Sequence, residues 1–348
     1  MSRIKALQYY ILARLLLAPL MIWTIVTVVF FLLRVLPWLL QSTIGDPVDA
    51  VLGSRAPESV KEEYRQRLGL ADPLWVQYLR YLGSLLRFDL GSSLTSQGEA
   101  VWDTIGRHFP ATAELAVCSM AIALLIGITV GMLAASRPNS WLDVGGRLFG
   151  IITYALPMFW MGMLMQLLFA VQLGWFPIGD RFPASLFPPP GPTGLYTIDS
   201  LLAGDLTSFF TALYYLFLPS LTLGLLLSGI FERIVRVNLK QTLRADYVEA
   251  ARARGIPERR ILVAHALKNA MIPVITILGL TFASLLGGAI LTEVTFSWPG
   301  LANRLYDAIS LRDYPTVQGI LVFFAVLVVI ASIAIDILNA YIDPRIRY

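Results

Sequence analysis

Six long stretches of this 348-residue chain carry no charged side chain, and they constrain the fold more than any other feature. Each stretch has at least 19 residues, and a helix needs roughly 20 apolar residues to cross about 30 Å of hydrocarbon. Lipid offers no partners to open backbone groups, so the stretches predict an all-α integral membrane protein with six transmembrane helices. They are Leu15–Leu33, Leu115–Ser136, Leu148–Gly179, Leu206–Phe231, Asn269–Thr292 and Tyr314–Ile335.

The composition agrees with a membrane protein, because 57% of the residues are hydrophobic and only 14% are charged. A seventh uncharged stretch, Phe182–Ile198, contains five prolines. Proline lacks the backbone donor that a helix in lipid needs, so we interpret this stretch as an exposed loop. The N-terminus could be a signal peptide, but its apolar stretch is too long and no Ala-x-Ala site follows, which favours an uncleaved first transmembrane helix.

Charge predicts the orientation of these helices. With six spans both termini lie on one side, and the segments on that side are 1–14, 137–147, 232–268 and 336–348. These segments hold 16 Lys/Arg and 7 Asp/Glu, whereas the opposite segments hold 11 Lys/Arg and 16 Asp/Glu. Positive residues mark the cytoplasmic side, so we expect both termini to be cytoplasmic. The basic isoelectric point therefore needs no nucleic-acid partner.

The spans divide the chain into four parts. Residues 1–35 hold the N-terminal cytoplasmic end and the first transmembrane helix, and 36–110 form an external helical scaffold. Residues 111–340 form a five-helix core with a cytoplasmic loop at 232–270, and 341–348 are a cytoplasmic tail. We find no convincing internal repeat at the residue level.

The external scaffold contains two predicted helices. The first begins near Pro57 and stops at Gly69, and the second begins with Asp72 as its N-cap and Pro73 at its first position. The second helix has an amphipathic stripe that we expect to pack on the membrane bundle or lie at its surface. The stripe consists of Leu74, Tyr78, Leu82 and Leu85.

Several kinds of chemistry lack the residues they need. None of the four lysines follows a glycine, so a phosphate-binding loop that ends in Gly-Lys cannot be written. The two histidines, His108 and His265, lie outside the uncharged stretches, and the single Cys118 allows neither a disulfide nor a thiolate cluster. We therefore predict no catalytic, cofactor-binding or metal-binding residues, and the chain resembles a pathway without its own energy source.

The largest cytoplasmic segment contains two short helices around a Gly-Ile-Pro turn. Asp246 suits the start of the first helix, where its carboxylate would accept bonds from free N–H groups. Gly255 stops this helix, Ile256 anchors the turn, and Pro257 opens the second helix. One predicted face of the first helix combines Tyr247, Ala250, Ala251 and Arg254. The second helix presents Ile261, Leu262, His265 and Asn269 before it enters the membrane near Pro273.

Three functions compete for this hairpin. A DNA-binding helix-turn-helix is disfavoured, because so short a segment in a membrane bundle leaves little room for a supporting helix. An anionic lipid surface would attract the arginines but leaves the Ala/Gly pattern unexplained. A docking site for a cytoplasmic partner explains the charge, the small residues and the rigid turn together. An ordinary positive-inside loop would explain the arginines alone.

Two adjacent motifs and a series of shorter ones resemble a known family. "EAARARGI" at Glu249–Ile256, followed by "ILVAHALKNAMIP" at Ile261–Pro273, resembles the EAA loop of ABC importer permeases. The ordered series is similar to the B-type permease subunit of dipeptide/oligopeptide ABC importers over nearly the whole chain. The further motifs are Gly45–Gly53, Leu68–Leu79, Phe88–Leu94, Phe109–Leu115, Leu218–Leu225, Phe296–Leu301, Arg312–Gly319 and Asp343–Arg347.

This resemblance implies a type I ABC importer permease fold and a role in binding-protein-dependent transport. The chain would pair with a second homologous permease subunit, and two cytoplasmic ABC ATPases would supply the energy. An extracytoplasmic solute-binding protein would deliver a peptide or a related small solute to the outer face of the permease in the inner (plasma) membrane of a prokaryote. The implied coupling-loop residues are Asp246, Tyr247, Glu249, Ala250, Ala251, Arg252, Arg254 and Gly255, with His265, Asn269 and Pro273 on the second helix.

The sequence departs from the family pattern at Phe88, where glycine is common, and at Ala71. The Pro-rich loop 182–192 is poorly matched, so its role stays open, as do the residues that line the pathway. The substrate is not identified either, because members of the family carry peptides, nickel or other solutes. A secondary transporter or channel acting alone is the main rival, and an intramembrane enzyme lacks the histidines and carboxylates it would need.

Overall fold

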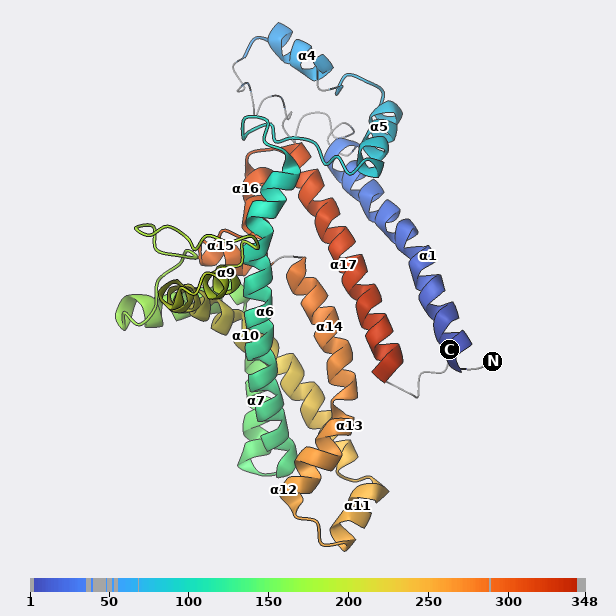
Figure 1. The fold of residues 1–348 in the computed structure, drawn as a ribbon, viewed down its shortest axis with the longest axis vertical. Coiled ribbons are helices and arrows are strands. Elements are labelled where there is room, and N and C mark those ends of the chain that lie inside the picture. Colours follow the sequence, from blue (N-terminus) through green and yellow to red (C-terminus); the bar gives the residue numbers. More distant parts are fainter. Residues whose placement is uncertain are drawn as a thin grey trace.

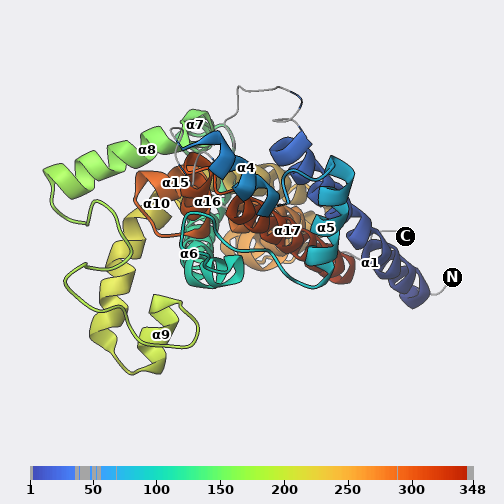
Figure 2. The same cartoon turned by 90° about the horizontal axis from the view of Figure 1, so that it is seen from above.

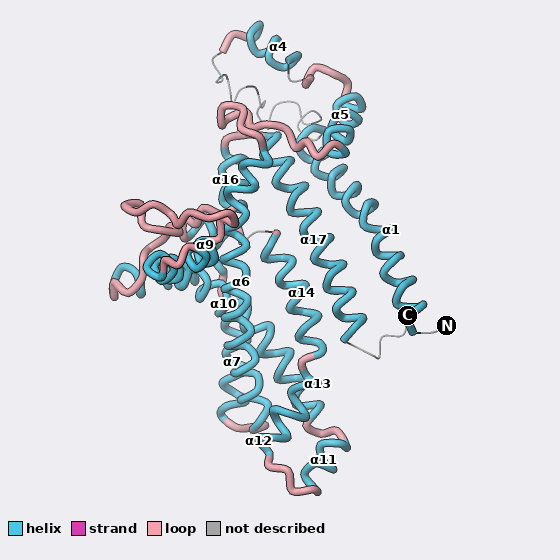
Figure 3. Tube along the Cα trace, in the orientation of Figure 1, coloured by secondary structure: helices cyan, strands magenta, loops and turns pink. Residues whose placement is uncertain are grey.

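The computed structural model describes residues 3–35, 39, 48, 52, 56–67, 69–287 and 289–342. Within these residues the secondary structure is helical, apart from one isolated antiparallel bridge between Ser92 and Ala100 (Figure 3). The all-α prediction is therefore confirmed for this part of the chain. The motif Asp343–Arg347 and most of Gly45–Gly53 lie outside the described residues.

Four helices are long and apolar enough to cross a membrane individually. The helix α1 (Arg3–Phe30) continues as the π-helix η1 (Phe31–Val35), and the others are α6 (Val101–Ser136), α10 (Leu206–Thr242) and α17 (Tyr314–Ile342). Each contains one of the uncharged stretches. Three of them, α1, α6 and α10, extend well beyond their stretches, because helix-forming residues continue past the charged residue that bounds each stretch.

Two further helix pairs bring the number of candidate spans to six if each pair counts as one. The first pair, from α7 (Trp141–Ala155) to α8 (Met158–Met165) and η2 (Gln166–Gln172), is bent by 103°. The prediction of one continuous helix over Leu148–Gly179 was therefore wrong. Pro157 lies at the break, where its ring and missing N–H end the helical ladder.

The second pair is bent by 53° between residues 258–270 and α14 (Ile272–Leu286). The predicted span Asn269–Thr292 was also too long as one helix. The helix α14 ends at Leu286, and α15 (Ile290–Thr295) is a separate short helix.

The helices form an elongated bundle (Figure 1). The short helices α4 (Glu58–Arg67) and α5 (Leu74–Leu86) lie at one end, and the Arg-rich hairpin lies at the other. The helices α1 and α17 occupy one side, whereas α8 and α9 (Tyr196–Leu202) project from the opposite side and α7 packs along α6 and α10 (Figure 2). The central core lies where α6 packs on α10 and α14.

The amphipathic stripe of α5 faces the bundle, as expected. Its four residues are half-buried, whereas Trp75, Leu79 and Leu86 on the other side are exposed. Tyr78 shares a 2.7 Å hydrogen bond with Thr27 of α1. The predicted cap was displaced by one residue, because Pro73 is the N-cap of α5 and the Asp72 carboxylate instead accepts a 2.7 Å bond from Arg80.

Three buried carboxylates join helices in the half of the molecule that carries α4 and α5. We call Glu114, Glu293 and Asp313, with their hydrogen-bond donors, the carboxylate junction. Glu293 accepts bonds from the Thr112 hydroxyl on α6 at 2.7 Å and from the Asn303 amide N–H on α16 (Leu301–Ser310) at 2.8 Å. A side chain on Gly300 would collide with the Glu293 carboxylate, so any larger residue there would displace the carboxylate from its hydrogen bonds.

The other two carboxylates fix loops onto helices. Glu114 of α6 receives the Arg181 guanidinium at 2.7 Å, and the backbone and hydroxyl of Thr197 donate to its other oxygen. Arg181 also lies 3.7 Å from the ring centroid of Tyr196, a cation–π contact. Asp313, just before α17, holds the segment that precedes α6. Its donors are the Ser93 hydroxyl, the Leu94 amide and the hydroxyls of Thr95 and Thr316.

Candidate docking site on the basic hairpin

The predicted hairpin connects α10 with α14 and forms one extremity of the molecule (Figure 1). Its first arm is α11 (Asp246–Ala253). Its second arm consists of α12 (Glu258–Arg260), the π-helix η3 (Ile261–Leu267) and α13 (Lys268–Ala270). We refer to residues 246–270 as the hairpin.

The two arms have a small core of their own. Val248 and Ala251 of α11 pack against Ile261 of η3, and these three side chains are at most 7% exposed. Leu243 and Ile256 cover this core at its edges. A self-supporting core lets the hairpin keep its shape while one face of α11 remains free.

The turn between the arms follows the predicted pattern. Gly255 has a φ of +73°, and its N–H donates to the carbonyl oxygen of Arg252 at 2.9 Å. This left-handed conformation costs glycine little, whereas a side chain would strain it. Pro257 is the N-cap of α12, where its missing N–H leaves no broken bond.

The start of α11 differs from the expectation. Ala245 is the N-cap, and Asp246 occupies the first helical position without a side-chain capping bond. The carboxylate still lies beside the positive end of the helix dipole, so its charge remains favourable there.

A hydrogen bond also links the arms at their open end. The Asn269 side-chain amide donates to the Tyr247 hydroxyl at 2.8 Å, and it lies 3.3 Å from the His265 carbonyl oxygen. His265 itself is partly buried within η3. These three predicted site residues therefore lie together.

The second arm connects the hairpin to the membrane helices. Ala266 and Ala270 pack against Ala135 of α6 and Leu239 of α10. At the far end of the arm, Pro273 lies in the first turn of α14, after the 53° bend. Because proline cannot donate to the carbonyl of Asn269, the helical ladder is interrupted there.

The structure divides the predicted face of α11. Ala251 points into the hairpin core, whereas Tyr247, Ala250 and Arg254 are exposed. The prediction that both alanines share the outer face was wrong, since their neighbouring positions point about 100° apart on a helix. The Glu249 side chain is exposed with Ala250 and forms no hydrogen bond or ion pair with another described residue, although its charge lies near Arg252 and raises the pKa of that group less than Glu258 does.

The hairpin carries more positive than negative charge. Arg252 of α11 donates to Glu258 of α12 at 2.6 Å, and this bond raises the pKa of Arg252 above its ordinary value. The pair spans the turn and braces the two arms. The side chains of Arg254, Arg259 and Arg260 remain exposed.

Two buried ion pairs near the base of the hairpin were missed at the sequence level. Lys240 of α10 binds Asp143 of α7 at 2.7 Å, and Arg236 binds Glu232 within α10 at 2.7 Å. The Glu232 carboxylate fits against Gly150 of α7, where a side chain would collide with it. The signal was present in the spacing of Gly146 and Gly150, which puts two small residues on one face of α7.

Comparison with known proteins identifies the family. The model of the family described as "Binding-protein-dependent transport system inner membrane component" matches residues 127–348. The di/tripeptide transport system permease protein of Pseudomonas aeruginosa is 41% identical over 320 residues, which cover 92% of this chain and 93% of that protein.

Other relatives are similar over comparable lengths. The dipeptide transport system permease protein of Alkalihalophilus pseudofirmus is 37% identical over 98% of this chain and 100% of its own length. The oligopeptide transport system permease protein of Bacillus subtilis is 35% identical over 89% of this chain and 92% of its own length. The family match and these relatives together cover the hairpin, the long helices and the carboxylate junction. This chain belongs to the family of inner membrane components of binding-protein-dependent transport systems, and it is a permease subunit of an ABC importer, whose ATPase is a separate protein.

Proposed function

We propose that this permease imports short peptides and that the hairpin is the site where a partner ATPase docks. The substrate proposal rests on the relatives, whose names describe di/tripeptide, dipeptide and oligopeptide transport. An extracytoplasmic binding protein would deliver the peptide to the end of the bundle that carries α4 and α5.

One observation carries the docking proposal. The hairpin has its own core, yet the face of α11 with Glu249 and Ala250 is exposed at the extremity of the molecule (Figure 1). The small side chain of Ala250 permits close approach of a partner surface, and the exposed carboxylate of Glu249, which also attracts Arg252, is accessible to that surface. Asp246, Tyr247 and Arg254 surround this face.

The hairpin is connected so that movement of a docked ATPase reaches the membrane helices. Its second arm packs on α6 and α10 through Ala266 and Ala270, and the chain continues directly into α14. ATP-driven closure of two ATPases would then displace the hairpin and the attached helices as a rigid body, opening the pathway to alternate sides.

A second homologous permease completes the proposed pathway. The helices α7 and α8 expose large apolar side chains, among them Ile151, Trp160 and Met163. Part of this surface would face the second permease and part would face lipid. No nucleic acid takes part, since the Arg-rich hairpin is occupied by its protein partner.

The charge distribution supports the proposed orientation. The first turn of α1 and the last turn of α17 point toward the end of the bundle that carries the hairpin (Figure 1). The segments assigned to that side hold the excess of Lys/Arg, so both termini and the hairpin would face the cytoplasm of a prokaryote whose inner membrane contains the importer.

Peptide uptake by the reconstituted importer tests the proposal. Glu249→Arg reverses the charge of the exposed face, and Gly255→Pro is incompatible with the observed φ of +73°. We expect both variants to lose uptake and peptide-stimulated ATP hydrolysis. Glu62→Arg, the same substitution at the opposite end on α4, serves as the matched control for ATPase binding, which it should keep.

Two results would contradict the proposal. Uptake and ATPase binding that persist in both hairpin variants would exclude the hairpin as the docking site. Peptide movement by the chain alone, in liposomes without ATPases, would favour a secondary transporter or channel instead.

A further inference from the structure

A cavity of about 660 Å³ lies between α7 and α10, farther into the bundle than the hairpin. Its volume is within the range of about 300–1,000 Å³ that small-ligand sites occupy. The lining combines apolar side chains, such as Ile151 and Ile230, with four charged residues. The charged residues are Arg147, Glu232, Arg233 and Arg236.

The packing of the helices gives the depth of this cavity in the membrane. Ala135, near the end of the uncharged stretch of α6, packs in one cluster with Leu239 of α10, and Gly131 lies against Val235 one turn earlier. The level of Leu239 therefore marks the edge of the hydrocarbon on the hairpin side. Arg233 precedes Leu239 by six residues on the same helix. At a rise of 1.5 Å per residue, Arg233 lies about 9 Å deeper in the membrane.

Arg233 is an unusual residue for this depth. Its side chain is exposed and forms no hydrogen bond or ion pair with another described residue. A guanidinium surrounded by hydrocarbon is unfavourable, so charged residues at membrane depth face water-filled cavities or one another. The exposed position of Arg233 therefore indicates that the cavity contains water rather than lipid chains.

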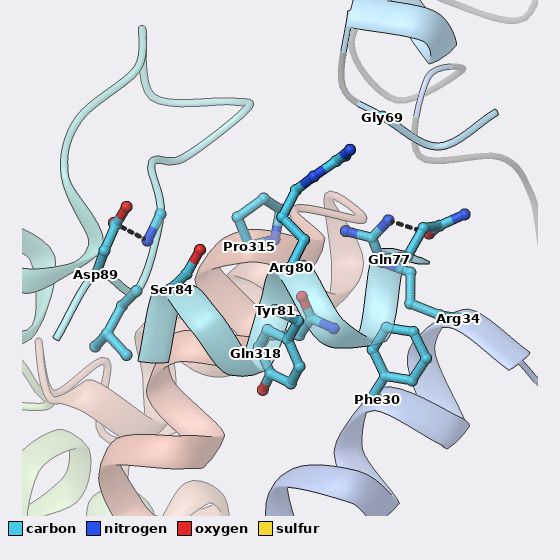
Figure 4. A pocket seen from close by; sticks show the side chains of 12 residues that line it. Phe30, Arg34, Gly69, Gln77, Arg80, Tyr81, Ser84, Asp89, Pro315 and Gln318 are labelled. Carbon is cyan, nitrogen blue, oxygen red and sulfur yellow. Dashed lines mark hydrogen bonds between the residues drawn. The ribbon is translucent and has the colours of Figure 1, made fainter. Parts of the chain in front are cut away.

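The arginines of the cavity beneath α5, at the other end of the molecule, differ from Arg233 (Figure 4). Arg34 lies at the end of the first candidate span, and its Nη1 donates to the Gln77 side-chain oxygen at 3.1 Å. Arg80 binds the Asp72 carboxylate at 2.7 Å. Both of these guanidinium groups have polar partners within the chain, whereas Arg233 remains available to a ligand.

The other charges of the cavity leave its lining positive. Arg236 pairs with the fully buried Glu232 at 2.7 Å, so these two charges compensate each other. Arg147 lies 3.5 Å from Asp143, whose other oxygen binds Lys240, so Asp143 compensates only one of these two positive charges. The Arg147 side chain is 49% exposed and adds to the positive potential. Such a cavity attracts an anion.

Depth and lining together narrow the chemistry of the ligand. Lipid phosphates lie outside the hydrocarbon, so they are not expected at the depth of Arg233. A suitable solute has an anionic group for Arg233 and a body that tolerates the apolar walls. Every peptide with a free C-terminus carries such a carboxylate, whatever its sequence, and the apolar walls accept side chains of different shapes.

We propose that this cavity is a water-filled chamber of the translocation pathway, in which Arg233 binds the C-terminal carboxylate of a peptide in transit. This inference rests on the proposed import of peptides. An ion pair in contact with water is weak, so the chamber would hold the peptide without trapping it.

Thiol accessibility tests whether the cavity contains water. Cys118 is the only cysteine, so Cys118→Ser gives a background without thiols. In this background, Arg233→Cys in the complete importer should react with membrane-impermeant charged thiol reagents, added to inverted membrane vesicles. Leu20→Cys is the matched control and should not react. Leu20 is exposed on α1, on the side of the bundle that α1 and α17 occupy, and it follows the charged Arg14 by six residues.

The charge at position 233 tests carboxylate binding. Arg233→Cys should lower peptide transport by the reconstituted importer about fivefold. Modification with a trimethylammonium reagent restores a positive charge and should recover most of this loss, whereas a sulfonate reagent should not. The comparison is repeated with a C-terminally amidated peptide that the importer transports. Its transport should not distinguish the two reagents, because the amide offers no charge for position 233 to bind.

Two results would overturn the proposal. An Arg233→Cys thiol that does not react with the charged reagents would place this side chain against lipid or against the second permease. Equal effects of the two reagents, or the same difference for free and amidated peptides, would show that the charge does not act on the carboxylate. A wild-type importer that transports no peptide would instead refute the proposed function, while a reactive Arg233→Cys would still show a water-filled chamber.

Discussion

At one end of the molecule the carboxylates Glu293 and Asp313 are fully buried and each accepts several hydrogen bonds. At the other end, the Glu249 side chain on the hairpin is exposed and forms no hydrogen bond or ion pair with another described residue. Both regions contain acidic residues within sequence motifs of the family. An acidic residue of a family motif can therefore have either of two roles. At the buried end it holds helices together, and at the hairpin it remains accessible to a partner.

The comparison predicts a large loss of stability for one glutamate substitution and almost none for another. Glu293→Ala leaves the Thr112 hydroxyl and the Asn303 amide without their acceptor and creates a cavity. We expect a loss of about 3 kcal/mol or more in the free energy of unfolding. Glu249→Ala should change stability by less than about 0.5 kcal/mol, because its side chain is exposed. Thermal unfolding of the two variants in detergent measures this difference, and equal destabilisation would refute the contrast.

Breaking a buried ion pair should likewise cost more stability than breaking an exposed one. Arg181→Gln breaks a pair with Glu114 in which both side chains are 5% exposed, and it should cost about 3 kcal/mol. Arg252→Gln breaks the hairpin pair with Glu258, where the side chains are 42% and 66% exposed, and it should cost less than about 1 kcal/mol. Unfolding at low and high salt checks the prediction, because only the exposed pair should weaken as salt rises.

Acid should loosen the carboxylate junction through Asp313. Burial on its own would raise the pKa of Asp313, but the hydrogen bonds that its carboxylate accepts lower it below the ordinary value. The stabilisation is therefore present above the unfolded pKa of about 3.9 and is lost as pH falls through the folded pKa.

Unfolding temperatures measured from pH 6 to pH 3 test this dependence. The unfolding temperature of the wild-type chain should exceed that of Asp313→Asn near pH 6, and this difference should shrink below about pH 4. A constant difference between the two chains across the whole range would show that Asp313 contributes no pH-dependent stability. This is a smaller effect than the substitutions above, since it changes protonation and leaves the side chain in place.

The sequence predicted the helical class and the hairpin turn well, because both depend on local signals. Uncharged stretches identify helices that lipid can surround, and Gly255 with Pro257 marks the turn. The sequence predicted the ends of the helices poorly. The stretches were defined by their first charge, so helices that continue past a charge were cut short and Pro157 was overlooked inside a long stretch.

The same definition hid the carboxylate junction. Glu114 directly precedes the stretch that begins at Leu115, Glu293 directly follows the one that ends at Thr292, and Asp313 precedes the one that begins at Tyr314. Each was treated as the edge of a span, yet each is buried. Their partners lie far away in sequence, so only the folded structure brings the donors to them.

The inward position of Ala251 could have been predicted from the sequence, since Val248 and Ala251 are three residues apart on one face of α11.

Co-purification of the ATPase with a variant at Ala250 tests the central claim most directly. Ala250→Trp places a bulky side chain on the exposed face of α11 and leaves the core of Val248, Ala251 and Ile261 intact. Ala203→Trp, an exposed alanine just after α9 and away from the hairpin, is the matched control. The account predicts that the ATPase is lost from Ala250→Trp and retained by the control, whereas an ATPase bound equally to both variants would contradict docking at the hairpin.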